Sequence, residues 1–177
     1  MSLPATTHPL GPNDARLTVH TRKAGAAAVA GHNLLIEVGS WSATLTLGDG
    51  AALTLTADSR SLKVLEGTGG IQSLGDGDMA NISQTIDDEV LKGGAIEFRS
   101  DSVEATPGGL TVRGELNLLG SRKPITFELN VAEDGRFSGE ATIKQSDWGM
   151  KPYSALFGTL KVADEVSVAI DGRLPSS

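Results

Sequence analysis

A strict alternation of apolar and polar residues, interrupted by glycine-rich turns, is the sequence feature that most constrains the fold. Leu17 and Val19 alternate with Thr18 and His20, and the pattern recurs within residues 96–99 and 110–118. Successive side chains of a β-strand point to opposite faces, so each such segment predicts a strand with one buried face and one solvated face. One-sided strands of this kind are typical of antiparallel sheets, whereas the strands of parallel sheets are apolar on both faces.

The number of these segments predicts a sheet that closes on itself. Eight or more strands are separated by turn sequences such as Gly48–Gly50, Pro107–Gly109 and Glu133–Gly135, and 22 of the 177 residues are glycine. This pattern predicts an all-β antiparallel barrel of eight strands or slightly more. The apolar parity reverses between Val38 and Trp41, which requires a bulge or turn at Gly39–Ser40.

One segment has the period of a helix instead. Its apolar residues are Met79, Ile82, Ile86 and Val90, which share one helical face. Asn81 with Gln84 resembles a capping box, and Asp78 is an equally good N-cap. Lys92 and Gly93 suit the C-terminal end. We therefore predict one short α-helix over residues 79–92.

Length and terminal composition predict a single domain over residues 14–172. Residues 1–13 contain three prolines and no periodicity, and residues 173–177 end in Pro-Ser-Ser. We expect both terminal segments to be flexible.

The charge balance and the absence of cysteine exclude several classes of function. Fifteen basic and 22 acidic residues give a net charge of −7, which disfavours nucleic acid as a partner. With no cysteine there is no disulfide, thiolate metal site or thiol catalysis. No apolar run is long enough for a transmembrane helix and no signal peptide is recognisable, so we expect a cytoplasmic protein, or a periplasmic or secreted one if a leader has been removed.

Candidate chemical motifs are weak in this sequence. His20 and His32 lack the spacing of a zinc site, and Gly75–Ala80 matches a dinucleotide-binding pattern without the strand that should precede it. The acidic run Asp87–Glu89 is read as a solvated helix face rather than a calcium site. No nucleophile elbow is present. We therefore expect no catalytic residue, no metal and no cofactor.

The inward faces of the predicted strands form the candidate ligand site. Their side chains either pack against one another in a filled barrel or line an apolar tunnel. Trp148, Met150, Tyr153 and Phe157 cluster in an irregular segment that either covers the core or forms a ligand mouth or dimer contact. The candidate ligand-binding residues are Val19, Ile36, Leu45, Leu55, Ile96, Phe98, Leu116, Leu118, Phe127, Leu129, Phe137, Ile143, Trp148, Met150 and Val168.

Three segments in the same order resemble motifs of the YceI-like family. They are residues 95–100 (AIEFRS), 116–127 (LNLLGSRKPITF) and 145–150 (QSDWGM). Gln145 and Trp148 stand where that family has arginine and phenylalanine. The resemblance implies a lipocalin-like antiparallel barrel, a helix near residues 80–92, a polyisoprenoid or similar lipid inside, and frequent dimers.

The combined expectation is a non-catalytic protein that binds, stores or transports an apolar isoprenoid-like or fatty-acid-like lipid. The partner would be this small molecule, with no nucleic acid, no membrane-integral segment and a homodimer as the expected assembly. Two alternatives stay open: a small-molecule isomerase or hydrolase that uses the barrel as a pocket, and a filled barrel that serves as a structural or interaction module.

Overall fold

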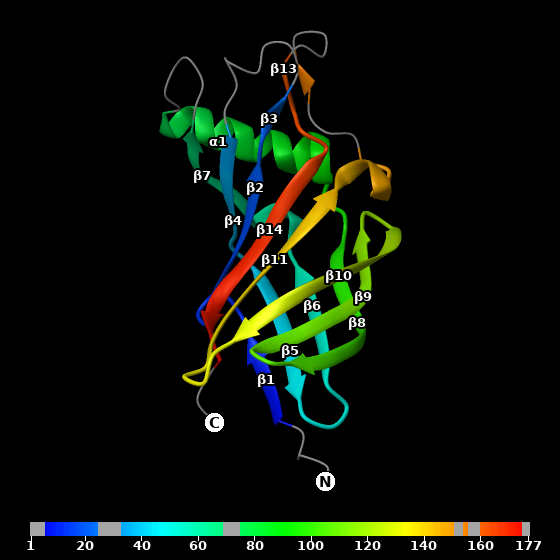
Figure 1. Cartoon of the computed structure of the whole chain (residues 1–177). Coiled ribbons are helices and arrows are strands. Elements are labelled where there is room, and N and C mark those ends of the chain that lie inside the picture. The colour runs from blue at the N-terminus through cyan, green and yellow to red at the C-terminus, as the bar shows by residue number, and fades with distance from the viewer. Residues whose placement is uncertain (1–5, 25–32, 69–74, 151–153, 156–159, 175–177) are drawn as a thin grey trace.

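The chain folds around one large, strongly curled antiparallel sheet (Figure 1). The computed structural model describes residues 6–24, 33–68, 75–150, 154–155 and 160–174. Eleven strands form the sheet in the order β1-β5-β6-β8-β9-β10-β11-β14-β2-β4-β7. A small sheet of β12, β13 and β3 extends one end of the molecule. The predicted all-β, antiparallel barrel-like architecture is confirmed, and the described residues contain one α-helix.

The strands have the following bounds. They are β1 (Thr6–Leu10), β2 (Ala15–Thr21), β3 (Lys23–Ala24), β4 (Asn33–Val38), β5 (Trp41–Leu47), β6 (Ala52–Ala57), β7 (Leu62–Thr68), β8 (Ile96–Thr106), β9 (Gly109–Leu118), β10 (Ser121–Val131), β11 (Arg136–Lys144), β12 (Ser154–Ala155), β13 (Leu160–Val162) and β14 (Glu165–Arg173). Two short 3₁₀ turns, η2 (Ser59–Ser61) and η4 (Gln145–Trp148), connect strands.

The end strands of the sheet, β1 and β7, are not neighbours in the strand order. Two crossing connections, which we call the corner of the sheet, link its two ends instead. The connection from β4 to β5 crosses from one end of the strand order to the other at Gly39–Ser40, and the connection from β6 to β7 crosses back through η2. The N–H of Gly39 donates to the carbonyl of Ser61, and the N–H of Asp58 donates to that of Ser40, each at 2.9 Å. This corner is the turn that the parity reversal predicted, and it keeps the apolar side chains inward on both sides.

The helix begins earlier than its apolar face indicated. Helix α1 spans Asp76–Thr85 and continues as the π-helical turn η3 (Ile86–Leu91). The N–H of Gly75 donates to the Asp78 carboxylate at 3.0 Å, so Asp78 stabilises the first turn from inside the helix. The predicted Asn81–Gln84 capping box is wrong. Lys92 and Gly93, both with positive φ, end the helix where the sequence placed its end.

The prediction that residues 1–13 are flexible is wrong for residues 6–10. They form β1, which pairs with β5 from Thr6 opposite Leu47 to Leu10 opposite Ala43. Leu10 is buried in the core. β1 is an edge strand, where a proline such as Pro9 is tolerated. At the other terminus, Arg173 belongs to β14 and the N–H of Leu174 donates to Gly135.

A β-bulge in β8 gives the sheet part of its curvature. The pairing of β8 with β9 shifts between Ser100 and Ser102, which leaves Asp101 as the extra residue. Gly114 of β9 lies at this point, where a Cβ atom would collide with the Arg99 carbonyl oxygen and lie 2.8 Å from the ring of Phe98. A glycine in the strand therefore lets β9 pack closely against the bulge.

Candidate ligand-binding cavity

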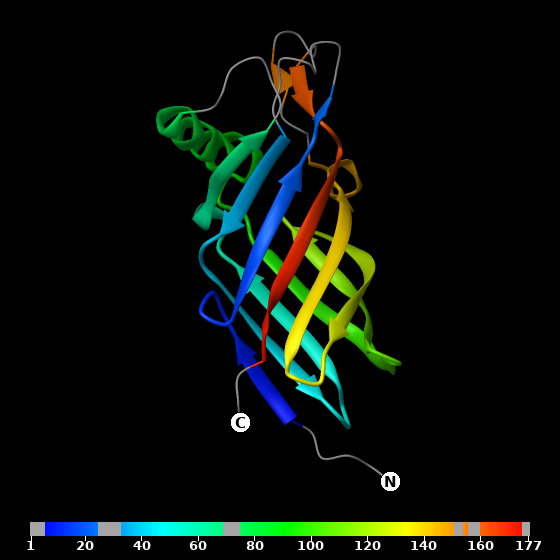
Figure 2. The same ribbon diagram turned by 60° about the vertical axis from the view of Figure 1, so that its left-hand side comes forward.

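The curled sheet encloses a cavity of about 600 Å³. Residues on the inner faces of strands from both halves of the sheet and on α1 and η3 form its wall. Figure 2 shows the curl of these strands. This volume lies within the usual range of small-molecule sites, roughly 300–1,000 Å³. The side chains of the described residues therefore leave substantial space inside the sheet, unlike those of a filled barrel.

Most of the residues that the alternation pattern placed inward line the cavity. Of the fifteen residues predicted as ligand-binding, all except Trp148 line the cavity. They are Val19, Ile36, Leu45, Leu55, Ile96, Phe98, Leu116, Leu118, Phe127, Leu129, Phe137, Ile143, Met150 and Val168. Their contact with a ligand stays a prediction.

Two aromatic rings meet in this wall. Phe98 of β8 and Phe127 of β10 have ring centroids 5.4 Å apart and ring planes inclined at 58°. This tilted geometry is a favourable one for aromatic pairs. The two strands lie on either side of β9, so the curl of the sheet brings the rings together.

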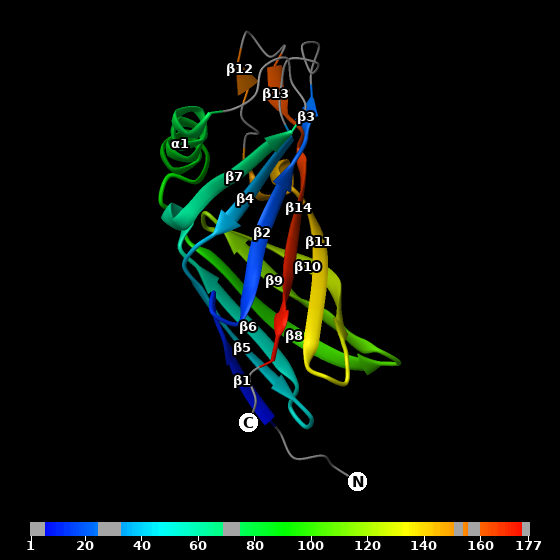
Figure 3. The same cartoon turned by 90° about the vertical axis from the view of Figure 1, so that its left-hand side faces the viewer.

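The helix supplies a part of the wall that the sequence prediction did not include. Ile82, Thr85, Ile86 and Leu91 line the cavity. The helix that carries them lies beside β7 (Figure 3). Ser83 holds α1 to that edge strand, because its Oγ accepts the N–H of Val64 at 3.0 Å and donates to the carbonyl of Met79 at 3.0 Å. The apolar helical face was visible in the sequence, but its position against the sheet was not. The side chain of Val90, the last residue of that face, lies outside the described residues.

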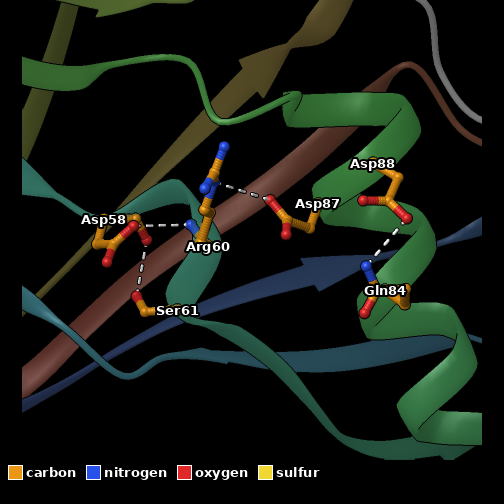
Figure 4. A network of polar contacts seen from close by, with 6 residues as sticks. All are labelled: Asp58, Arg60, Ser61, Gln84, Asp87 and Asp88. Carbon is orange, nitrogen blue, oxygen red and sulfur yellow. Dashed lines mark hydrogen bonds and ion pairs between the residues drawn. The ribbon is translucent and has the colours of Figure 1, made fainter.

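A polar network joins the helix to the corner of the sheet (Figure 4). Asp58 accepts the N–H of Arg60 at 2.9 Å, and the Arg60 guanidinium lies 3.8 Å from the carboxylate of Asp87 in η3. Gln84 donates to Asp88 at 2.9 Å one turn along the helix. Two members of the acidic run thus have protein partners, and the side chain of Glu89 lies outside the described residues.

The described cavity wall contains five polar side chains, and most of them hydrogen-bond to protein groups. Thr85 donates to the carbonyl of Asn81, Gln145 donates to the carbonyl of Ala163, and Glu140 accepts the hydroxyl of Ser167. Thr21 and Lys23 are the other two polar residues of the wall. Thr21 is only 8% exposed, and its Oγ1 has no hydrogen-bond partner among the described residues.

Comparison with known proteins identifies the family. The sequence model of the YceI-like domain matches residues 10–174. The chain belongs to the YceI-like family. No curated protein matches it by sequence.

Solved structures share the fold of this YceI-like domain at low sequence identity. The crystal structure of BcnA from Burkholderia cenocepacia has a TM-score of 0.66 and 18% identity, covering 92% of this chain and 96% of that one. A polyisoprenoid binding domain from Saccharophagus degradans, implicated in plant cell wall breakdown, has a TM-score of 0.52 and 11% identity, covering 96% and 99%. At such identities these similarities establish a common fold.

Trp148 of this YceI-like domain lies outside the cavity wall, contrary to the sequence expectation. It is the last residue of η4 and is 5% exposed. Its Nε1–H donates to the backbone carbonyl of Leu116 in β9 at 2.8 Å. The indole is packed in the hydrophobic core and is tied to β9 by this hydrogen bond, and a tryptophan's need for a buried acceptor was the signal that sequence reasoning overlooked. Tyr153 and Phe157 lie outside the described residues.

The segment at residues 145–150 (QSDWGM) is held by Asp164. The Ser146 hydroxyl and the Ser146 N–H both donate to the Asp164 carboxylate. The hydroxyl hydrogen bond contributes most to holding the pKa of Asp164 below its ordinary value of 3.8, with smaller contributions from the N–H and from Lys144. This contact fixes η4, and through it Trp148, against the strands.

The remaining candidate groups do not form a site in the described part of the chain. His20 is exposed on the outer face of β2, and His32 lies outside the described residues. Within residues 6–24, 33–68, 75–150, 154–155 and 160–174, no three His, Asp or Glu side chains gather as metal ligands. The described helix is too short and polar to cross a membrane.

Proposed function

We propose that this YceI-like domain binds an isoprenoid-like or other long-chain lipid in its cavity, and stores or transports it without changing it chemically. The cavity of about 600 Å³ carries the proposal, because its wall is almost entirely aliphatic and aromatic. The similarity of fold to a polyisoprenoid binding domain supports the same class of ligand.

The energetics favour a long apolar chain over a small polar molecule. Removing apolar surface from water stabilises a complex by about 25 cal/mol per Å². A chain that buries roughly 300 Å² would therefore gain about 7.5 kcal/mol, which lies within the ~4–15 kcal/mol range for the cost of association. Shorter ligands would fall well below that cost, so tight binding requires a chain that fills the cavity.

The wall is poorly equipped for catalysis. An isomerase or hydrolase would need an acid–base pair facing the ligand. Glu140 is the acidic residue of the described wall, but it is exposed, alternates with the inward-facing Gly139 and Ala141, and accepts a hydrogen bond from Ser167 at 2.6 Å. These features favour a binding protein over an enzyme.

Organic extraction of the purified full chain, followed by mass spectrometry, tests the proposal. We expect an apolar compound to copurify with the protein, and the delipidated protein to take up an added long-chain prenol. Clean extracts from repeated preparations, together with no uptake of any long-chain lipid, would overturn the proposal. A homodimer stays a prediction, which light scattering at several concentrations checks.

A further inference from the structure

The cavity has one polar end. Strand pairing aligns Thr21 with Leu34, Lys23 with Val162, and Ile143 with Val166. Gln145 follows Ile143 by two residues, so Thr21, Lys23 and Gln145 lie toward the same end of the curled sheet. At the opposite end Phe137 pairs with Gly172, and Gly172 pairs with Ala15. No polar wall residue belongs to this second group of described residues.

Thr21 occupies an inward position, and its hydroxyl has no hydrogen-bond partner in the described part of the chain. It has the same parity in β2 as Leu17 and Val19, which line the cavity, and it lines the cavity itself. Leaving a buried hydroxyl without a partner costs about 1–3 kcal/mol. Rotation about the Cα–Cβ bond moves the hydroxyl between staggered positions without moving the backbone. A polar atom of a ligand at this end would give the hydroxyl the partner that the described protein does not supply.

Lys23 adds a positive charge two residues further along the same face. Its side chain is partly buried, and it is the cationic residue of the described cavity wall. The other polar wall residues, Thr85, Glu140 and Gln145, already hydrogen-bond to protein groups. An ammonium group in an otherwise apolar wall attracts an anion more strongly than it would in water.

We propose that the cavity takes a single-chain amphiphile whose anionic head group, a carboxylate or a phosphate, is bound by Thr21 and Lys23 while its apolar tail extends toward Phe137. This inference rests on the proposed lipid-binding function and specifies the ligand class and its orientation. The chemistry shared by the two head groups is a negatively charged oxygen that accepts one hydrogen bond from a hydroxyl and one from an ammonium.

Binding of head-group analogues with one tail tests the orientation. The delipidated full chain is titrated with hexadecanoic acid, hexadecyl phosphate and hexadecanol, each below its critical micelle concentration. We expect at least one anionic probe to bind about tenfold more tightly than the alcohol, as hydrogen bonds to charged groups allow. The two anionic arms distinguish a carboxylate ligand from a phosphate ligand.

Two variants and two matched controls locate the head group. Lys23→Met should abolish the preference for the anionic probe, and Thr21→Val should weaken anion binding about tenfold while stabilising the ligand-free protein. Two control variants are Thr18→Val, on the outer face of the same strand, and Lys63→Met, on the exposed face of β7. Both should leave the affinity for the anionic probe and the stability of the ligand-free protein unchanged. If Thr21→Val does not fold, the loss or survival of the anion preference in Lys23→Met decides whether the head group is assigned correctly.

The outcomes separate this inference from the proposed function. Equal affinities for the three probes, or an anion preference that survives Lys23→Met, would overturn the head-group assignment and leave lipid binding intact. If the wild-type protein binds no probe and no prenol, the proposed function itself fails.

Discussion

Phe98 and Phe127 place their rings 5.4 Å apart within the cavity wall, although β9 separates their strands in the sheet. Strands two positions apart in a flat sheet are about 10 Å from each other. The curl of the sheet therefore brings the two side chains into contact on its concave side. The pair marks the face on which a ligand would lie.

Replacing Phe127 with aspartate should eliminate lipid retention. Phe127 is half-buried and faces the cavity, so Phe127→Asp puts an unpaired carboxylate against the ligand's tail, where desolvation is costly. Thr126→Asp introduces the same charge on the exposed outer face of the same strand and should retain lipid. Lipid recovered per mole of folded protein is the measurement. A folded Phe127→Asp variant with wild-type lipid content would contradict the inward assignment.

Trp148→Phe should lower stability without affecting lipid binding. The phenylalanine keeps an aromatic ring but leaves the carbonyl of Leu116 without its indole donor, which should reduce the free energy of unfolding by about 1–3 kcal/mol. Chemical denaturation measures the loss, and lipid titration measures binding. Because Trp148 lies outside the cavity wall, a large loss of affinity in a stable variant would show that this description of the site is wrong.

Ser83→Ala should loosen the helix from the edge strand. The substitution removes the acceptor of the Val64 N–H, and we expect that amide to exchange with solvent at least tenfold faster. Asn81→Ala, at an exposed position on the same helix, is the control. Hydrogen exchange followed by NMR reports on the single amide. Equal protection of Val64 in both variants would show that the helix is held by other contacts.

The Ser146–Asp164 contact should contribute stability that disappears in acid. The pKa of Asp164 is lowered in the folded protein, so the Asp164 carboxylate binds a proton more tightly in the unfolded chain than in the folded protein. The contribution is therefore complete well above the ordinary pKa of 3.8 and is lost as pH falls through the lower folded value.

Ser146→Ala removes the hydrogen bond that contributes most to this pKa shift. Its destabilisation should be constant near neutral pH and shrink below about pH 4. Urea unfolding of both proteins across this pH range measures the difference, with the exposed Ser138→Ala variant as control. A difference that grows on acidification would contradict the sign of the shift.

Local pattern was sufficient for most of the strands, for the existence of the helix and for part of the cavity wall. Alternation assigns each side chain to a face regardless of the partner strand, so residues such as Leu116 and Phe127 were placed inward correctly. The same logic failed for β1, because a five-residue segment containing Pro9 shows its pairing only when the edge of β5 is present. Trp148 was predicted from the clustering of aromatic residues in an irregular segment, which does not show which way each ring points, and it does not line the cavity.

The sequence by itself determined the period-two pattern, the single helix and the apolar character of one face of the sheet, because these depend on residues close together in the chain. The tertiary structure decided how the sheet ends join at Gly39–Ser40 and η2, where α1 lies against β7, and how much space remains inside. Those properties depend on distances between segments far apart in sequence. The hydroxyl of Thr21, which has no hydrogen-bond partner among the described residues, is a tertiary property too, because the partners available to a side chain depend on the segments that pack around it.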